Sequence, residues 1–288
     1  MDTKPIRVLI ASDGSPSAER AIALVECVSW PRGTKLRIIT VAAPMPAAIV
    51  AEMSRAGTEA QSQVRSVGGY DVEVVLRVGR AASHIVDEAK DWQAELVLLG
   101  SRGLGPLGSA FLGSVAAEVV DHAPCAVLIA RTVCAGNVLF ADDGSETAAD
   151  AAAFLARVPA LGDRELRVLS VAHVQAPLDS GIAPHLRELA RHGHAELVNA
   201  AREQHDQLAG ARARSFVRPS GRVSHDVRVG DPAKELLSDA AEHHTDLIVL
   251  GSHGRTGLER LLLGSVARKV LLHAAGSVLI VHRSSSNT

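Results

Sequence analysis

Aromatic residues are scarce in this 288-residue sequence, where two Trp, one Tyr and four Phe make up 2% of the chain. Proteins that bind single-stranded nucleic acid stack bases on aromatic side chains, so the composition offers little surface for that purpose. An excess of one charge is lacking as well, because the formal net charge is -2 and no run of five or more Lys or Arg occurs. We therefore expect neither nucleic acid nor an anionic membrane as a partner.

Cysteine is also rare, and Cys27, Cys125 and Cys134 show no C-x-x-C spacing. Three cysteines at such spacings argue against a disulfide framework and against a zinc site, and they are better explained as buried thiols. Long hydrophobic runs are missing too. The N-terminal apolar stretch ends at Ser12 and Asp13, which makes it too short for a signal peptide core or a membrane span. We expect a cytoplasmic protein.

What the sequence does contain is a repeat. "RVLIASDGS" from Arg7 returns as "NVLFADDGS" from Asn137, and "GSRGLGPLGSAFLGSV" (100–115) returns as "GSHGRTGLERLLLGSV" (251–266). A chain of this length commonly forms two domains. We therefore predict tandem domains over residues 1–133 and 134–288. The second copy is longer, which places an insertion of about twenty residues between Val171 and Val229.

The apolar pattern within each half alternates between two periods. "RVLIA", "LRIITV", "VEVVLRV", "LVLLG" and "AVLIA" are nearly continuous apolar runs, typical of parallel strands covered on both faces. "SAERAIALVECV" and "AASHIVDEAKDW" between them keep their apolar residues on one side, as amphipathic helices do. We predict the α/β class, with two tandem Rossmann-like domains, each a doubly wound, mainly parallel five-stranded sheet. The insertion is predicted to form a long, charged helix.

Ligands in such sheets bind outside the carboxyl ends of the strands, where the strand order reverses. Two motifs fall there: a D-G-S turn after the first strand, and a G-x-x-G-(nine residues)-G-S loop after the fourth. The loop glycines could take positive φ and approach a ligand closely, and the following helix could present amides and a hydroxyl to a phosphate. The first half supplies Asp13, Gly14, Ser15, Gly100, Gly103, Gly113 and Ser114. The second half supplies Asp143, Gly144, Ser145, Gly251, Gly254, Gly264 and Ser265.

Each motif could also serve the fold alone. D-G-S forms Asx turns without any ligand, and glycines form tight turns without one. Ser114 and Ser265 could serve as helix N-caps, which would not exclude a phosphate contact. Two copies of the loop with the same nine-residue gap favour the ligand-binding interpretation.

Together, the D-G-S opening, the glycine loop and the closing "VLI" strand resemble the universal stress protein family, in its tandem form and in its ATP-binding branch. The resemblance covers nearly the whole chain. It implies ATP, or AMP after slow hydrolysis, in each half, with Mg²⁺ held through Mg-ATP by Asp13 and Asp143. It further implies adenine contacts at Val41 and Val171, and phosphate-side contacts at Arg102, Val115, His253, Arg255 and Val266. Because Leu104 stands where the second half has Arg255, we expect two unequal sites.

Three classes of function are compatible with these motifs. The first is a nucleotide-dependent regulator in the stress response, whose protein partner the sequence does not identify. The second is a slow ATPase or an enzyme that phosphorylates itself on Ser114 or Ser265, although neither half has a G-K-[ST] loop or an obvious general base. The third is a nucleotide-free interaction protein. The closing strands "VLIAR" and "VLIVHR" are expected to pair between domains or between chains, giving self-association.

Overall fold

The computed structural model describes residues 4–43, 70–103, 112–158, 163–174, 184–217, 222–254 and 263–283, with 51, 54–55, 57–59, 61–62, 64 and 160–161 between them. The first half contains β1 (Arg7–Ala11), α1 (Pro16–Cys27), β2 (Lys35–Ala42), β3 (Asp71–Val78), α3 (Ala81–Asp91), β4 (Leu96–Gly100), α4 (Ser114–His122) and β5 (Ala126–Ala130). The second half contains β6 (Asn137–Ala141), α5 (Glu146–Arg157), β7 (Glu165–Ala172), α6 (Pro184–Ser215), β8 (Arg222–Val229), α7 (Pro232–Glu242), β9 (Leu247–Gly251), α8 (Ser265–His273) and β10 (Ser277–Val281).

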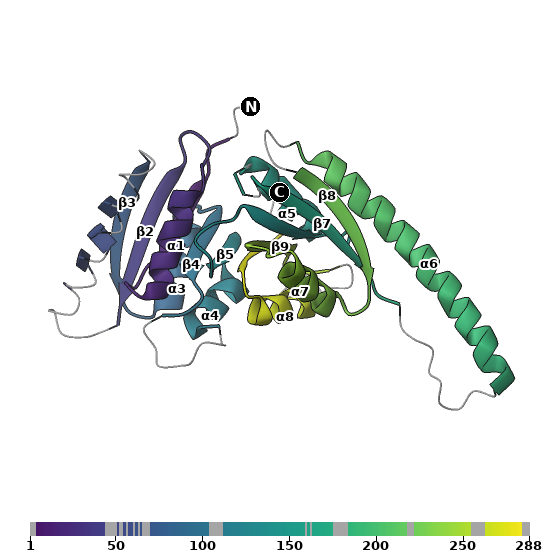
Figure 1. Cartoon of the computed structure of the whole chain (residues 1–288). Coiled ribbons are helices and arrows are strands. Elements are labelled where there is room, and N and C mark those ends of the chain that lie inside the picture. The colour runs from purple at the N-terminus through teal and green to yellow at the C-terminus, as the bar shows by residue number, and fades with distance from the viewer. Residues whose placement is uncertain are drawn as a thin grey trace.

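All ten strands join in one sheet, in the order β3-β2-β1-β4-β5-β10-β9-β6-β7-β8 (Figure 1). Neighbouring strands are parallel within each half, so the predicted α/β, Rossmann-like architecture is confirmed. Strand order reverses between β1 and β4, and again between β6 and β9. The predicted domain boundary falls in the connection between β5 and β6, where its position stays a prediction.

The two halves meet at the closing strands, which pair antiparallel within the chain: Ile129 lies opposite Val278 and Val127 opposite Ile280. Because of this antiparallel seam, the carboxyl ends of the strands lie on opposite edges of the sheet in the two halves. Each closing strand already has a neighbour on both sides, so the outer strands of the described sheet are β3 and β8. Association of two chains stays a prediction, and the closing strands are not free to make it.

Two apolar layers cover the sheet. One contains α1, α5 and the C-terminal part of α6, and the other contains α3, α4, α7 and α8. The predicted long helix is present as α6, which packs on β7 and β8 while its N-terminal end projects beyond the sheet (Figure 1). Phe216, just after α6, meets Phe140 of β6 edge to face, with ring centroids 5.5 Å apart. The strands β4, β5 and β10 are buried at every residue, which explains their uninterrupted apolar sequences.

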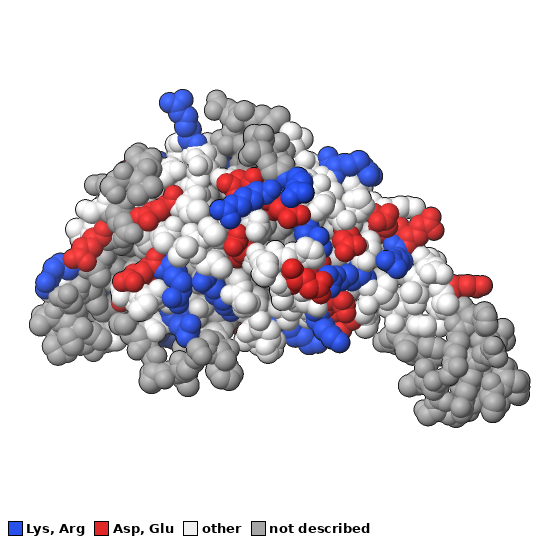
Figure 2. All heavy atoms as spheres, in the orientation of Figure 1, with Lys and Arg blue, Asp and Glu red and all other residues white. Residues whose placement is uncertain are grey.

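Charged residues of both signs are interspersed on the face shown in Figure 2, in keeping with the low net charge. Within the part of the chain that the structure describes, no helix combines the length and apolar character of a membrane span.

The prediction of buried thiols is wrong for Cys27, which is exposed, and only partly correct for Cys125 and Cys134, which are half-buried. Cys27 is the last residue of α1, where the helical period turns it away from the buried stripe of Ala18, Ile22 and Val25. Cys125 lies largely in the interior, and this burial raises the pKa of its thiol to about 12.

Helices α1 and α5 begin at matching caps. The hydroxyl of Ser15 accepts a hydrogen bond from the Ala18 amide at 3.2 Å, and Ser145 accepts one from Ala148 at the same distance. Replacing Ser15 with alanine is expected to lower the free energy of unfolding by about 1 kcal/mol, because an amide of the first turn loses its acceptor. Urea denaturation followed by circular dichroism would measure the loss. Ser145→Ala should give a similar loss, and two unchanged midpoints would contradict the prediction.

Candidate functional site

The D-G-S turns stand at the carboxyl ends of β1 and β6. In both halves the aspartate accepts a hydrogen bond from the serine amide two residues on, at 3.0 Å from Asp13 to Ser15 and from Asp143 to Ser145. The glycine between them is left-handed, with φ of +74° at Gly14 and +76° at Gly144. The interpretation of these motifs as Asx turns is therefore correct. Oδ1 of each aspartate makes the turn, and Oδ2 is the second carboxylate oxygen.

That second oxygen faces the glycine loop. A Cβ placed on Gly103 would stand 2.6 Å from Oδ2 of Asp13, and one on Gly254 would stand 2.8 Å from Oδ2 of Asp143. The turn after the first strand and the loop after the fourth thus meet in each half, as the topology predicts. Glycine is required in the loop because the carboxylate comes so close to the backbone.

The expectation of positive φ at the other loop glycines is wrong. The sequence predicts a positive φ at Gly100, Gly103, Gly251 and Gly254, and none of these four residues has one. Their role is to permit close packing: a Cβ on Gly100 would lie 2.5 Å from the carbonyl carbon of Ser17 in α1. Glycine at the end of β4 therefore lets the first helix cross the sheet at contact distance.

The loops end at the N-termini of α4 and α8. Gly113 and Gly264 are the N-cap residues and make no side-chain cap bond, so Ser114 and Ser265 are the first helical residues and not the N-caps that their sequence position allowed. The amide of each cap glycine donates a hydrogen bond to a carbonyl at the start of the loop. Gly113 donates to Ser101 O and Gly264 to Ser252 O, both at 2.8 Å. The serine side chains are exposed. Each loop thus presents a helix N-terminus and an uncommitted hydroxyl, which together suit an anion.

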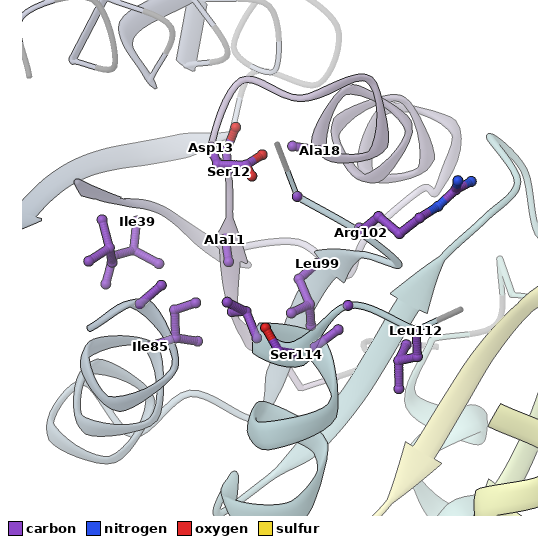
Figure 3. A pocket seen from close by; sticks show the side chains of 17 residues that line it. Ala11, Ser12, Asp13, Ala18, Ile39, Ile85, Leu99, Arg102, Leu112 and Ser114 are labelled. Carbon is purple, nitrogen blue, oxygen red and sulfur yellow. The ribbon is translucent and has the colours of Figure 1, made fainter. Parts of the chain in front are cut away.

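A cavity of about 320 Å³ opens between these elements in the first half (Figure 3). Eight of the predicted residues line it, from the turn, the loop, the end of β2 and the start of α4. They are Asp13, Val41, Gly100, Arg102, Gly103, Gly113, Ser114 and Val115. Gly14 and Ser15 are not lining residues and instead shape the turn. The guanidinium of Arg102 is directed away from Asp13 and Ser114 (Figure 3).

Sequence reasoning missed the apolar wall of the cavity. Most of these residues are small or aliphatic and belong to the same strands and helices as the core, so their sequence signal indicates only burial. They are Ala11, Ser12, Ala18, Ile39, Ala81, Ile85, Leu99, Leu112 and Ala116. The predicted contrast between Leu104 and Arg255 lies outside the described residues.

In the second half, the corresponding turn is tied to α6. Where the first half has Ser12, the second has Asp142, whose buried carboxylate pairs with Arg212 Nε of α6 at 2.8 Å. The other oxygen of Asp142 accepts the Gly144 amide at 3.0 Å. Ser170 donates to the Asp142 carbonyl and lies 2.7 Å from Nδ1 of His205 in α6. The inserted helix therefore supports the turn that carries Asp143.

Hydroxyl groups of α5 hold the second loop. Thr147 donates to the His253 carbonyl, and Ser145 reaches the same oxygen at 3.3 Å. In the first half, the Ser17 hydroxyl instead accepts the Arg102 amide at 3.2 Å. Among the described residues, no group of three His, Cys, Asp or Glu side chains could hold a metal ion unaided.

A doubly wound α/β sheet with a cavity at the point of reversal, closed by a glycine loop and a helix N-terminus, defines a Rossmann-like ligand-binding architecture. The model of the "Universal stress protein family" matches residues 6–131 and again 135–282. The chain therefore belongs to the universal stress protein family, as a tandem of two family domains.

Individual relatives agree with this assignment. Universal stress protein Rv2005c of Mycobacterium tuberculosis is 36% identical over 202 residues, which are 67% of this chain and 63% of that protein. Universal stress protein Mb2019 of Mycobacterium bovis is 28% identical over 95% of this chain and 94% of its own. The crystal structure of a universal stress protein from Archaeoglobus fulgidus matches 96% of this chain and 98% of its own with a TM-score of 0.64, at 19% identity, which shows the shared fold.

Proposed function

We propose that the chain binds ATP in the cavity of its first half and acts as a nucleotide-dependent regulator in the stress response. The observation that carries the proposal is the 320 Å³ cavity, which is of the size that small-molecule sites have. Its inner wall of Ile39, Val41, Ile85 and Leu99 is apolar and suits an adenine ring. Its outer end, at Ser114, is a helix N-terminus that suits phosphates.

The residues at the phosphate end also fit the ligand sterically. Gly103 and Gly113 line the cavity, and their lack of side chains keeps the loop backbone and Asp13 in close contact. Asp13 stands beside this end, so Mg²⁺ bound to the phosphates would complete a coordination shell that the protein does not build alone. AMP would occupy the same apolar wall and leave part of the phosphate end unused.

The second half is proposed as a weaker version of the same site. It keeps Asp143, Val171, Gly251, Gly254, Gly264, Ser265 and Val266 at the corresponding positions. It differs at the turn, where the Asp142 carboxylate adds a negative charge that pairs with Arg212. We include in the proposal a cytoplasmic setting.

Purification without added nucleotide, followed by denaturation and mass spectrometry, tests the proposal directly. Released ATP or AMP is expected, and calorimetry with ATP and Mg²⁺ should show binding to stripped protein. Absence of both would contradict the proposal and favour a nucleotide-free interaction protein. Turnover of many ATP molecules per second, or label from ATP on Ser114 or Ser265, would instead favour the enzyme.

Gly113→Ala should weaken binding at the first site by about tenfold, because the new methyl would press on the backbone of Arg102 and shift the loop that borders the cavity. The backbone at Gly113 accepts alanine, with φ of -64° and ψ of 149°, and the nearest atom to the new methyl would be 3.3 Å away. This contact is relieved by a shift of a few tenths of an ångström in the loop backbone, so the change is local. Gly264→Ala is the matched control: it should leave the stronger binding event unchanged.

A further inference from the structure

A second cavity, of about 440 Å³, lies where the two halves of the chain meet. Its wall is made by the end of α3 and the segment before β4, the start of β5, helix α5 and the end of β10. The antiparallel seam places the start of β5 beside the end of β10, so both halves contribute to one cavity. None of the residues expected to contact nucleotide lines it, which makes this cavity separate from the proposed nucleotide sites.

An ion pair joins the two halves in the wall of this cavity, which we call the seam cavity. Arg157 Nη2 of α5 lies 2.7 Å from Oε1 of Glu95, just before β4. Glu95 is fixed in turn, because its Oε2 accepts the Arg7 amide at 3.2 Å. Nε of Arg157 is buried and has no hydrogen-bond partner among the described residues. A guanidinium N–H can only donate, so Arg157 brings to the cavity wall a buried donor without an acceptor.

His282, the residue after β10, has the opposite need. Its imidazole donates a hydrogen bond to the backbone of Val120 in α4, and the donor is Nδ1, since the buried Nε2 has no partner within the described part of the chain. Burial, and then His253, lower the pKa of His282 to about 4, so the ring is neutral at pH 7. A neutral imidazole that donates through Nδ1 is an acceptor at Nε2. The same cavity wall therefore contains a buried acceptor without a donor.

The charges around the seam cavity balance. Lys90 and Arg157 are cations, Glu95 and Asp150 are anions, and the Cys125 thiol is neutral because burial raises its pKa to about 12. A ligand with a charge of one sign would meet as many like charges as opposite ones. A zwitterion can instead place each of its charged groups beside a group of opposite sign.

We infer that the seam cavity binds a small zwitterion of the α-amino-acid class that carries an apolar side chain. Its carboxylate would accept from Arg157 Nε, and its ammonium group would donate to His282 Nε2. Phe154 and Val281, which are apolar parts of the wall, would contact its side chain. One molecule would then supply both missing partners, which buried polar groups need. Because the partners come from both halves, the ligand would also hold the halves together.

The probe for this test is L-leucine, titrated against the full chain and followed by saturation-transfer NMR. We expect a Kd below about 1 mM. Isocaproate lacks the ammonium group and isoamylamine lacks the carboxylate, so each leaves one buried atom without a partner. Each should bind about tenfold more weakly than L-leucine, or weaker still. Glycerol, a neutral polyol, should not displace L-leucine.

Four variants locate the binding site. Ala153 of α5 is exposed and lines the cavity, so Ala153→Phe would fill the space without disturbing the core and should abolish binding. Ala149→Phe changes an exposed residue of the same helix outside the wall and should leave the Kd unchanged. Arg157→Lys keeps a cation for Glu95 but removes Nε, and His282→Asn keeps a donor near the position of Nδ1 but removes Nε2. Each should raise the Kd about tenfold.

Three results would overturn the inference. No saturation transfer to L-leucine would mean that water alone occupies the cavity. Isocaproate or glycerol binding as well as L-leucine would exclude the zwitterion. L-leucine binding that survives Ala153→Phe, in a variant whose urea midpoint matches that of Ala149→Phe, would place the ligand elsewhere. The inference does not rest on the proposed function, and measurements of ATP binding leave it unaffected.

Discussion

Replacing Arg212 with methionine is expected to lower the free energy of unfolding by about 3 kcal/mol, because the change removes one partner of a buried ion pair. The Asp142 side chain is fully buried, and Arg212 Nε lies 2.8 Å from its Oδ2. Methionine keeps an unbranched stem and most of the apolar contact of arginine but leaves this carboxylate without its cation. Urea denaturation followed by circular dichroism would measure the change.

Two further variants make the result specific. Arg202→Met changes an exposed arginine of the same helix and should leave the stability unchanged. Asp142→Ser combined with Arg212→Met installs the serine that the first half has at this position, and it should restore most of the loss because no buried charge remains. An Arg212→Met protein as stable as the wild type would show that the pair does not anchor α6.

The second large effect is expected on acidification. The pKa of His282 is about 4 in the folded chain and 6.5 in its ordinary range, because burial disfavours the imidazolium. Between pH 6.5 and 4 the unfolded chain therefore binds a proton that the folded chain does not. The neutral His282 therefore adds to the free energy of unfolding in full above pH 6.5. This addition, roughly 3 kcal/mol at most, is lost as the pH falls to 4.

Measuring unfolding free energies from pH 7 to pH 4 would show the effect as a difference between variants. His282→Gln removes the titrating group, so its stability should fall less steeply than that of the wild type over this range. His273→Gln changes an exposed histidine at the end of α8 and should follow the wild-type curve. Equal slopes for wild type and His282→Gln would mean that burial of this imidazole does not cause the acid sensitivity.

Much of the fold could be predicted because its strands are buried on both faces. "LVLLG" and "AVLIA" contain no polar residue, and short runs of this kind between amphipathic segments are typical of the inner strands of a parallel sheet. The insertion is predicted as a helix because its charged residues recur over a long segment without a turn signal. The position of the site followed from topology: Asp13 and Gly103 are far apart in the sequence, but both follow strands that end at the same edge.

The remaining features depend on contacts that no local pattern records. Arg131 donates to the Leu271 carbonyl because the antiparallel pairing of β5 and β10 brings the second half beside it. Arg212 meets Asp142 because α6 packs along β7. The requirement for glycine at position 100 comes from the closeness of α1 and not from its own backbone angles. Each of these facts joins segments that the sequence separates by tens of residues.

The antiparallel seam between β5 and β10 has a consequence for how partners can engage the molecule. Since the D-G-S turns of the two halves stand at opposite edges of the sheet, a molecule bound at one turn does not meet a molecule bound at the other.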